Sequence, residues 1–245
     1  MVITSLENDK VKKFRKLQKR KYRDEYNQYI VEGEHLIFEA YRKGAIEELI
    51  LLEGRENPLP VPYGYYSYDV MKKISSMDNP PDIMALCNRF DDSGEVKGDK
   101  ILILDGIQDP GNLGTIIRSA VAFDVDTIIL TENTVDLYNS KVLRATQGMF
   151  YHINIITREA MEVMLLLQNI GIPVYGTDVS EGCDVRELLP EEKKKYALVM
   201  GNEGNGVREV INKMCTKKLY ISMNKNVESL NVGIATSILL YELGR

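Results

Sequence analysis

The sequence has few of the residues from which metal centres and disulfide scaffolds are built. Its 245 residues include three cysteines and two histidines, and the cysteines lie far apart without a CxxC pair. Structural zinc sites need closely spaced Cys and His ligands, and disulfide frameworks need paired cysteines. We therefore expect no metal and no disulfide framework, and a histidine-based hydrolase has few candidate residues.

Long apolar runs are missing as well. No stretch approaches the roughly 20 apolar residues that a membrane-spanning helix needs. Residues 1–20 are rich in Lys and Arg and lack the apolar segment of a secretory signal. Hydrophobic residues make up 44% of the chain and charged residues 27%, as in ordinary globular proteins. We therefore expect a cytoplasmic protein with no membrane partner.

The common nucleotide-binding motifs are also absent. A dinucleotide fingerprint requires G-x-G-x-x-G, whereas Gly201, Gly204 and Gly206 carry these spacings in the reverse order. A P-loop requires Lys and then Ser or Thr after its last glycine, but Val207 and Arg208 follow Gly206. An NTPase and a hydride-transferring oxidoreductase are both disfavoured.

Positive charge is outweighed overall, since the formal net charge is −5, but it is concentrated near the N-terminus. Residues 10–23 contain nine Lys or Arg side chains and no acid. Contact with phosphate depends on the local field more than on total charge. A nucleic-acid surface and a solvated helix face explain this stretch equally well.

The pattern along the chain divides it into a small and a larger α/β unit. Residues 1–90 begin with the basic helix, and a strand, an amphipathic helix and further short elements follow. Residues 91–99 are polar and rich in glycine, which is typical of a linker. From 100 to 245 the order strand, loop, helix repeats. Continuous apolar strands between helices predict a mostly parallel sheet covered on both faces.

In the larger unit each strand is an apolar run, and each helix shows helical spacing of apolar residues. We expect strands at 101–104, 127–130, 153–157, 173–177, 196–200 and 219–222. We expect helices at 113–123, 140–149, 158–170, 207–214 and 230–243.

Three loops rich in glycine and asparagine follow three of these strands. They contain "DPGNLGTIIRSA", "VMGNEGNGV" and "ISMNKNVESLNVGIA" and lie within 104–120, 198–209 and 220–238. Because the carboxyl ends of parallel strands meet at one edge of a sheet, we expect the loops to form one shared site.

Taken in order, these loops resemble the three motifs of the SpoU/TrmH family of RNA ribose 2′-O-methyltransferases, within the SPOUT superfamily. The third ends in the family's Ser229-Leu230-Asn231 signature. Between the first two, "KVLRATQGMFYHINI" resembles the family's Arg-Ala-Ser-x-Gly segment, with Arg144 aligned. The resemblance covers about residues 100–243. Ser222 and Lys225 depart from the family pattern, which often has Pro and Gly there.

The resemblance implies a catalytic domain with a deep trefoil knot near its C-terminus, S-adenosylmethionine as cofactor, and a homodimer formed through this domain. The helix at 230–243 is a candidate for the dimer interface, and it would equally suit a buried core. Residues 1–90 resemble, more loosely, the family's RNA-binding domain, which favours RNA as the partner of the basic stretch. The RNA-binding candidates are Lys12, Lys13, Arg15, Lys16, Lys19, Arg20 and Arg144.

The family also implies roles for residues in the three loops. The candidates for the cofactor pocket are Gly201, Ile221, Met223 and Leu230. The catalytic candidates are Arg118, Asn112, Glu203, Ser229 and Asn231. Some accounts of the family make the arginine a general base, but Arg keeps its proton to very high pH. Gripping the target phosphate is the more conservative role.

Each catalytic candidate has an alternative explanation. Asn112 and Ser229 precede expected helices and could be ordinary N-caps. Arg118 could be a surface salt-bridge partner, and Glu203 could be a solvated turn residue. If Glu203 is functional, it could stay anionic near the sulfonium of the cofactor or could instead orient a loop. From the family resemblance and the separate N-terminal domain we expect a ribosomal RNA ribose methyltransferase. The alternatives are a tRNA ribose methyltransferase and an RNA-binding protein of the same fold that has lost catalysis.

Overall fold

The computed structural model describes residues 1–90, 94–179 and 181–245. Two compact units emerge from its contacts: residues 1–90 with 136–151, and residues 94–135 with 152–245. Residues 136–151 thus group with the first unit, whereas the sequence placed them in the domain at 100–245. The boundaries 1–90, 91–99 and 100–245 stay a prediction, and residues 91–93 of the expected linker lie outside the described residues.

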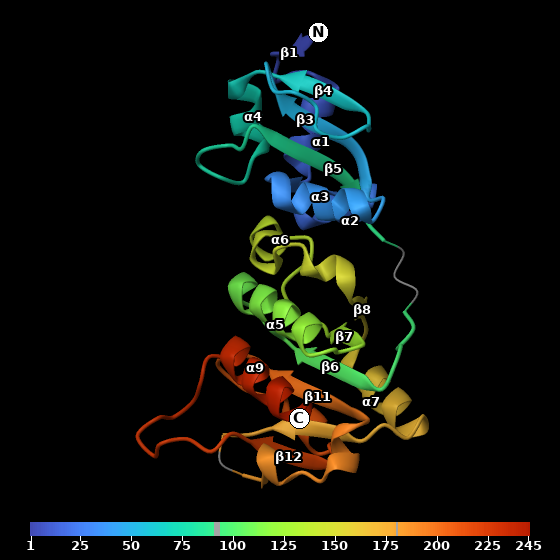
Figure 1. The fold of residues 1–245 in the computed structure, drawn as a ribbon, viewed down its shortest axis with the longest axis vertical. Coiled ribbons are helices and arrows are strands. Elements are labelled where there is room, and N and C mark those ends of the chain that lie inside the picture. Colours follow the sequence, from blue (N-terminus) through green and yellow to red (C-terminus); the bar gives the residue numbers. More distant parts are fainter. Residues whose placement is uncertain (91–93, 180) are drawn as a thin grey trace. The chain divides into compact units, whose positions relative to one another are not determined.

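The first unit is built on a five-stranded mixed sheet (Figure 1). Its strands are β1 (Val2–Ile3), β2 (Gln28–Glu32), β3 (Ile46–Leu52), β4 (Tyr63–Tyr66) and β5 (Ile83–Asn88), in the order β1-β4-β3-β5-β2. Its helices are α1 (Asp9–Lys16), α2 (Arg20–Tyr26), α3 (Glu34–Arg42), α4 (Tyr68–Ile74) and α6 (Ser140–Thr146). Sequence reasoning missed β5, although "IMALCN" is an apolar run, because the breaker "DNPPD" directly before it suggested a loop.

The expected basic helix is in fact two helices, α1 and α2, separated at residues 17–19. Leu17 turns into the core beside Val11 and Phe14. The Gln18 side chain donates to the carbonyl of Ile74 at 2.9 Å, at the end of α4. These tertiary contacts break the helix at a point where the charge pattern alone gave no signal.

Residues 136–151 are held to the first unit by a buried ion pair and an aromatic cluster. Arg23 and Asp136 form an ion pair at 2.5 Å, with side chains only 6% and 12% exposed. The hydroxyl oxygens of Tyr29 and Tyr151 lie 2.9 Å apart, and the ring of Tyr138 lies 4.6 Å from that of Tyr29. This segment therefore completes the core of the first unit.

The second unit contains a seven-stranded sheet in which every pairing is parallel, as expected. Its order is β10-β12-β9-β11-β6-β7-β8. The strands are β6 (Lys100–Asp105), β7 (Thr127–Leu130), β8 (Asn154–Thr157), β9 (Val174–Thr177), β10 (Cys183–Asp184), β11 (Tyr196–Gly201) and β12 (Lys217–Tyr220). Six of them confirm the predicted strands within two residues. The two-residue β10 is too short to leave a pattern in the sequence.

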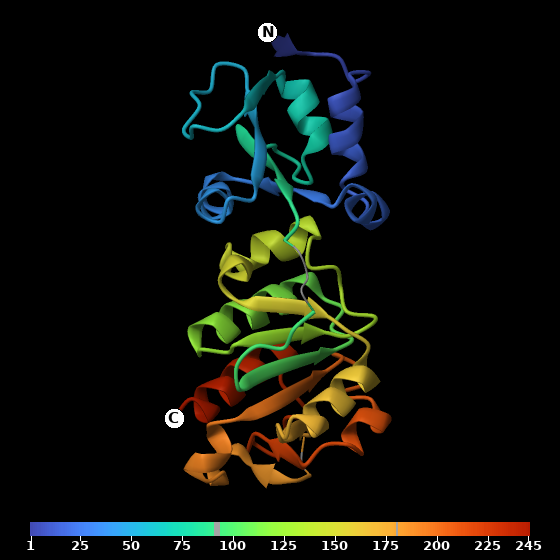
Figure 2. The same cartoon turned by 90° about the vertical axis from the view of Figure 1, so that its right-hand side faces the viewer.

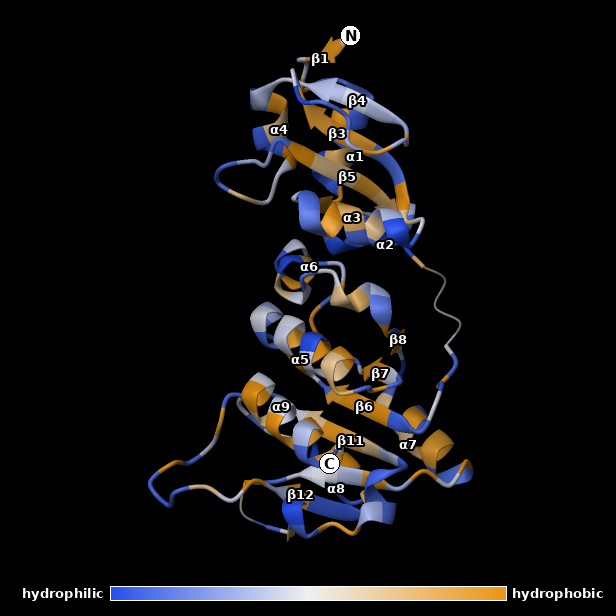
Figure 3. Cartoon of the chain, in the orientation of Figure 1, coloured by the Kyte–Doolittle hydropathy of each residue, from blue (hydrophilic) through white to orange (hydrophobic). Residues whose placement is uncertain are grey.

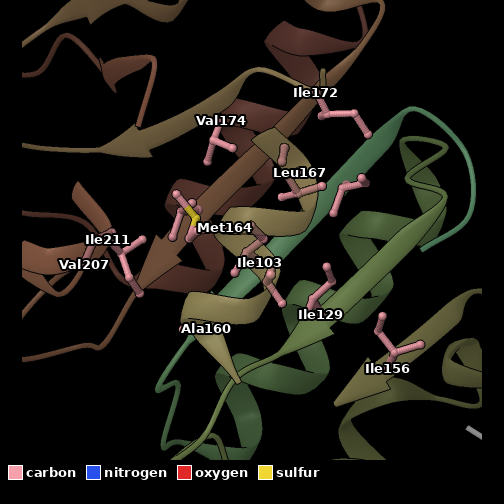
Figure 4. Packing of buried hydrophobic residues seen from close by; sticks show 14 residues of the cluster. Ile103, Ile129, Ile156, Ala160, Met164, Leu167, Ile172, Val174, Val207 and Ile211 are labelled. Atoms are coloured by element: carbon pink, nitrogen blue, oxygen red, sulfur yellow. The ribbon is translucent and has the colours of Figure 1, made fainter. Parts of the chain in front are cut away.

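Helices cover both faces of this sheet (Figures 1 and 2). They are α5 (Pro110–Ala122), α7 (Ala160–Asn169), α8 (Glu209–Asn212) and α9 (Val232–Leu243). On one face α5 and α9 pack together, and on the other α7 lies over the apolar strands (Figures 3 and 4). The core there joins Ile103 and Ile129 of the sheet to Met164 of α7 and Ile211 of α8. Within the described ranges, no helix is long and apolar enough to cross a membrane.

Helix starts in this unit differ by a few residues from the expected ones because side chains set them. The carboxylate of Asp109 accepts from the backbone N–H of Asn112 at 2.8 Å, so Asp109 is the N-cap and Pro110 follows at the first helical position. At α9 the N-cap is Asn231. Both caps lie in loops whose residues were expected to carry function.

Candidate functional site

A cavity of about 570 Å³ lies where β9, β11 and β12 end. Its walls come from residues 177–179, 200–207, 212, 219–221, 223, 229–232, 235 and 239. This volume lies within the range that small-molecule sites occupy, roughly 300–1,000 Å³. The second and third glycine-rich loops therefore meet around one cavity at the carboxyl edge of the sheet. The sequence predicted one site for all three loops, but residues 104–120 do not line the cavity.

All four residues expected in a cofactor pocket line this cavity: Gly201, Ile221, Met223 and Leu230. At Gly201 a Cβ atom would lie 2.1 Å from backbone atoms of Gly206 and Val207, so a side chain does not fit there. The loop folds back because the backbones of Asn202 and Gly206 exchange hydrogen bonds at 3.0 and 2.9 Å. Apolar side chains thus share the lining with the polar backbone of a tight loop, which suits a flat ring with polar edges.

A row of hydrogen-bonded side chains joins the three motifs beside this cavity. The Nδ2 atom of Asn231 donates to Oδ1 of Asn112 at 2.8 Å, and Nδ2 of Asn112 donates to Oε1 of Glu203 at 3.0 Å. Glu203 and Asn231 also line the cavity. Residues more than 90 positions apart in sequence therefore form one polar network.

Glu203 is fixed further by backbone groups of the first motif. The N–H groups of Gln108 and Asp109 donate to its carboxylate at 3.2 and 3.0 Å. Partial burial raises the pKa of Glu203, but hydrogen bonds from Asn112 and these backbone amides outweigh it and lower the pKa below its ordinary value. The carboxylate is therefore ionised at neutral pH.

Comparison with known proteins shows which protein family has this arrangement of loops. A model described as the SpoU rRNA Methylase family matches residues 99–241, which is more than half of the chain. The chain belongs to the SpoU/TrmH family of RNA 2′-O-ribose methyltransferases, in the SPOUT superfamily. A second model, described as an MRM3-like substrate binding domain, matches residues 8–85. The expected family and class of enzyme are thereby confirmed.

Similar proteins span nearly the whole chain. The 23S rRNA (guanosine(2553)-2′-O)-methyltransferase RlmP of Bacillus subtilis (strain 168) is 35% identical, with 98% of each chain covered. A TrmH-family structure from Porphyromonas gingivalis has a TM-score of 0.87 and 30% identity, again covering 98% of each chain. An AdoMet-bound rRNA methyltransferase from Sinorhizobium meliloti has a TM-score of 0.86 and 29% identity, covering 99% of this chain and 97% of its own.

The N-cap alternatives for two family-motif residues do not hold. Asn112 lies inside the first turn of α5, and Asp109 caps that helix. Ser229 lines the cavity, while Asn231 caps α9 through its Oδ1 atom, which accepts from the N–H of Gly233 at 2.9 Å. Asn231 therefore caps its helix with the oxygen of its amide and contacts Asn112 with the nitrogen.

Arg118, the expected key residue, stands apart from this network. It is exposed on α5 and is not among the residues that line the cavity. Within the described part of the chain its guanidinium makes no hydrogen bond or ion pair. Ser222 and Lys225, the two departures from the family pattern, are exposed and do not line the cavity either.

The expected RNA-binding residues of the substrate-binding domain lie on the outer side of α1 and at the start of α2. Five of them are exposed: Lys12, Arg15, Lys16, Lys19 and Arg20. The ammonium groups of Lys13 and Lys16 lie 5.5 and 5.3 Å from the ring centres of Tyr26 and Tyr22. These two rings lie 6.3 Å apart and nearly parallel, a feature that sequence reasoning missed. Its only signal was the spacing of four residues on one helix.

Arg144 has partners within the first unit. Its Nη1 atom donates to the hydroxyl of Ser76 at 2.6 Å and lies 3.8 Å from Oε1 of Glu32. Contact between Arg144 and RNA stays a prediction. Across the described residues there is no group of three or more His, Cys, Asp or Glu side chains that could hold a metal ion.

Proposed function

We propose that this chain transfers a methyl group from S-adenosylmethionine to a ribose 2′-hydroxyl of ribosomal RNA. The observation that carries the proposal is the hydrogen-bonded row of Glu203, Asn112 and Asn231 beside a cavity of about 570 Å³. Ribosomal RNA is favoured over tRNA because the Bacillus subtilis relative, which spans the whole chain, is a 23S rRNA methyltransferase. We propose that the protein acts in the cytoplasm.

The residues of the cavity fit the cofactor. Ile221, Met223 and Leu230 would pack against its flat base, and the tight loop at Gly201 would present backbone groups to the edges of that base. When bound, S-adenosylmethionine supplies an electrophilic methyl group. The protein must then hold the ribose hydroxyl in line with it and promote loss of the proton.

The two asparagines of the row are suited to hold the RNA. Oδ1 of Asn112 accepts from Asn231, and Oδ1 of Asn231 accepts from the backbone of α9. Each side-chain amide has a second N–H that these bonds do not use. The row therefore offers donors, which match the oxygen atoms of a phosphate or a ribose hydroxyl.

Glu203 acts here as an orienting residue. Its carboxylate already accepts from Gln108, Asp109 and Asn112, so its charge holds the first-motif loop against the second. Arg118 is proposed to grip the target phosphate with the planar fork of its guanidinium. Ser229 completes the polar rim of the cavity.

The catalytic domain is proposed to be a homodimer with a knotted C-terminal segment. Arg118 lies away from the cavity of its own chain, and α9 exposes Ile234 and Tyr241 at 52% and 47%. Exposed apolar side chains on α9, the helix that packs against α5, suit contact with a second copy of the chain. Sedimentation of the purified protein tests this part, and a monomer at all concentrations would contradict it.

The exposed lysines and arginines of α1 and α2 are proposed to bind the phosphates of the RNA, with Tyr22 and Tyr26 available to stack on unpaired bases. Replacing Lys16 and Arg20 by Glu should weaken RNA binding and reduce its salt dependence. Replacing Lys194 and Lys213, which are exposed on the other unit, by Glu is the control.

The test of the activity is methyl transfer from tritiated S-adenosylmethionine to unmodified ribosomal RNA or tRNA, followed by nucleoside analysis. We expect a 2′-O-methylated nucleoside in ribosomal RNA. Label in tRNA alone would change the substrate. Binding of RNA and of S-adenosylhomocysteine without any transfer would favour an RNA-binding protein that has lost catalysis, which the complete row disfavours.

A further inference from the structure

Arg208, which follows directly on the loop at 201–207, binds the carboxyl end of β6. Its backbone N–H donates to Oδ2 of Asp105 at 3.1 Å, and its Nε atom donates to Oδ1 at 2.8 Å. Nη2 lies 2.5 Å from the same Oδ1. The Asp105 side chain is only 1% exposed, so Arg208 neutralises a charge that is shielded from water.

The other side of the Arg208 guanidinium reaches the next strand. Its Nη1 atom donates to Oε1 of Glu132, just beyond the end of β7. The second oxygen of Glu132 accepts from the N–H of Ala160 at 3.0 Å, at the start of α7. Burial raises the pKa of Glu132, but the hydrogen bonds from Arg208 and Ala160 lower it overall. One side chain thus links the ends of two neighbouring strands.

The loop at 201–207 begins and ends at the same place in the sheet. Gly201 pairs with Asp105 in the register of β11 and β6. The Asn202 side chain donates to the carbonyl of Gly106 at 2.9 Å. After the loop has turned, Val207 enters the core and Arg208 returns to Asp105 (Figure 4 shows Val207 beside Ile211). The attachments at Asp105 therefore determine where the cavity wall lies.

We infer that Arg208 is a positioning residue for methyl transfer. It closes the loop at 201–207 onto Asp105 and Glu132. This closure fixes Gly201 in the cavity wall and Glu203 in the hydrogen-bonded row with Asn112. The inference rests on the proposed function for its catalytic consequence. Its structural part, the fixing of the loop, is independent of the ligand.

The geometry requires arginine at this position. A guanidinium spreads its N–H groups over a planar fork and contacts two carboxylates at once. The ammonium of a lysine is a single point charge, so Arg208→Lys would keep the charge but lose one of the two partners. A merely electrostatic role would tolerate Lys, whereas positioning of the loop would not.

A second arginine provides a matched control. Arg186 also binds a buried aspartate, with Nε 2.9 Å from Oδ1 of Asp184 and Nη2 2.6 Å from its Oδ2. Neither residue lines the cavity. Arg186→Met therefore removes a comparable ion pair from the same unit without touching the loop at 201–207.

The experiment compares Arg208→Met, Arg208→Lys and Arg186→Met in the full-length protein. Affinity for S-adenosylhomocysteine is measured by titration calorimetry, Tm by thermal unfolding, and exchange of the amides at 202–207 by mass spectrometry. We expect both Arg208 variants to bind at least about tenfold more weakly and to exchange faster in the loop. Arg186→Met should lower Tm and leave the affinity and the loop exchange unchanged.

The double variant Asp105→Asn/Arg208→Met separates positioning from stability. Removing both charges should restore Tm towards that of the wild type without restoring affinity or loop protection. Recovery of affinity together with Tm would overturn the inference, as would unchanged loop exchange in Arg208→Met. If the wild type fails to bind S-adenosylhomocysteine, the proposed function fails, and loop exchange still decides whether Arg208 fixes the loop.

Discussion

The two loops that wall the cavity are held to very different degrees. The loop at 201–207 is fastened at both ends and in its middle, through Asn202, Glu203 and the Arg208 that follows it. In the described part of the chain, residues 222–230 make only local hydrogen bonds, with the N–H groups of Asn226 and Val227 donating to Asn224 at 2.9 Å. One wall is therefore preorganised, and the other can adjust to what the cavity holds.

The largest effect is expected when the loop at 201–207 is forced open. Gly201→Ala places a Cβ atom 2.1 Å from the backbone of Gly206 and Val207, so the loop must move. We expect affinity for S-adenosylhomocysteine to fall about 100-fold or more, in calorimetry. The comparison variant is Gly204→Ala in the same cavity wall, whose Cβ atom meets nothing closer than 3.6 Å. Equal affinities for the two variants would show that the fastened wall is less rigid than its bonds suggest.

The next effect tests the row that joins the fastened loop to the first motif. Asn112→Ala removes a donor that faces Glu203 and should lower turnover about 100-fold. Because Asn112 does not line the cavity, affinity for the cofactor should change little. Methyl-transfer kinetics and calorimetry measure the two effects separately, with Ser119→Ala on the same helix as control. Parallel losses of both would contradict the assignment.

The pH dependence of stability tests how firmly Glu203 fastens its loop. Its pKa is lowered from the ordinary 4.5 in the folded protein, so its contribution is present at neutral pH and is lost as the pH falls below that value. Glu203→Gln should lower the free energy of unfolding at pH 7 by about 1 kcal/mol. Denaturant unfolding at pH 7, 5 and 4 should show the difference from wild type shrinking below pH 4.5. A constant difference would mean that the charge of Glu203 does not matter.

The smallest effect is expected in the loosely held wall. Lys225→Gly changes an exposed side chain that does not line the cavity. Stability should change by less than about 0.5 kcal/mol, and cofactor affinity should stay within about twofold. Thermal unfolding and calorimetry measure both, and a large loss of affinity would show that residues 222–230 are already ordered for binding.

Much of the second unit could be predicted from sequence because its signals are local. Apolar runs marked six of its seven strands. Periodicity fixes such elements without knowledge of their partners. The family resemblance, and no local pattern, indicated that Gly201, Ile221 and Leu230 share one pocket.

The features that the sequence did not predict depend on contacts between residues far apart in the chain, which no local pattern shows. Arg208 and Asp105 are 103 positions apart, and nothing beside either residue indicates an ion pair. The break between α1 and α2 arises because Gln18 binds the end of α4, 56 positions away. The grouping of Asp136 and Tyr151 with the first unit likewise rests on Arg23 and Tyr29.

That last grouping has a consequence for synthesis on the ribosome. Arg23 is buried and finds its counter-charge in Asp136, and Tyr29 finds the hydroxyl of Tyr151. Residues 1–90 emerge first, but the buried contacts of Arg23 and Tyr29 can form only after residue 151 has left the exit tunnel. By then β6, α5 and β7 of the second unit have already been translated. The first unit is therefore completed only after part of the second unit has been translated. A chain cut between residues 90 and 100 would separate Arg23 and Tyr29 from their partners Asp136 and Tyr151.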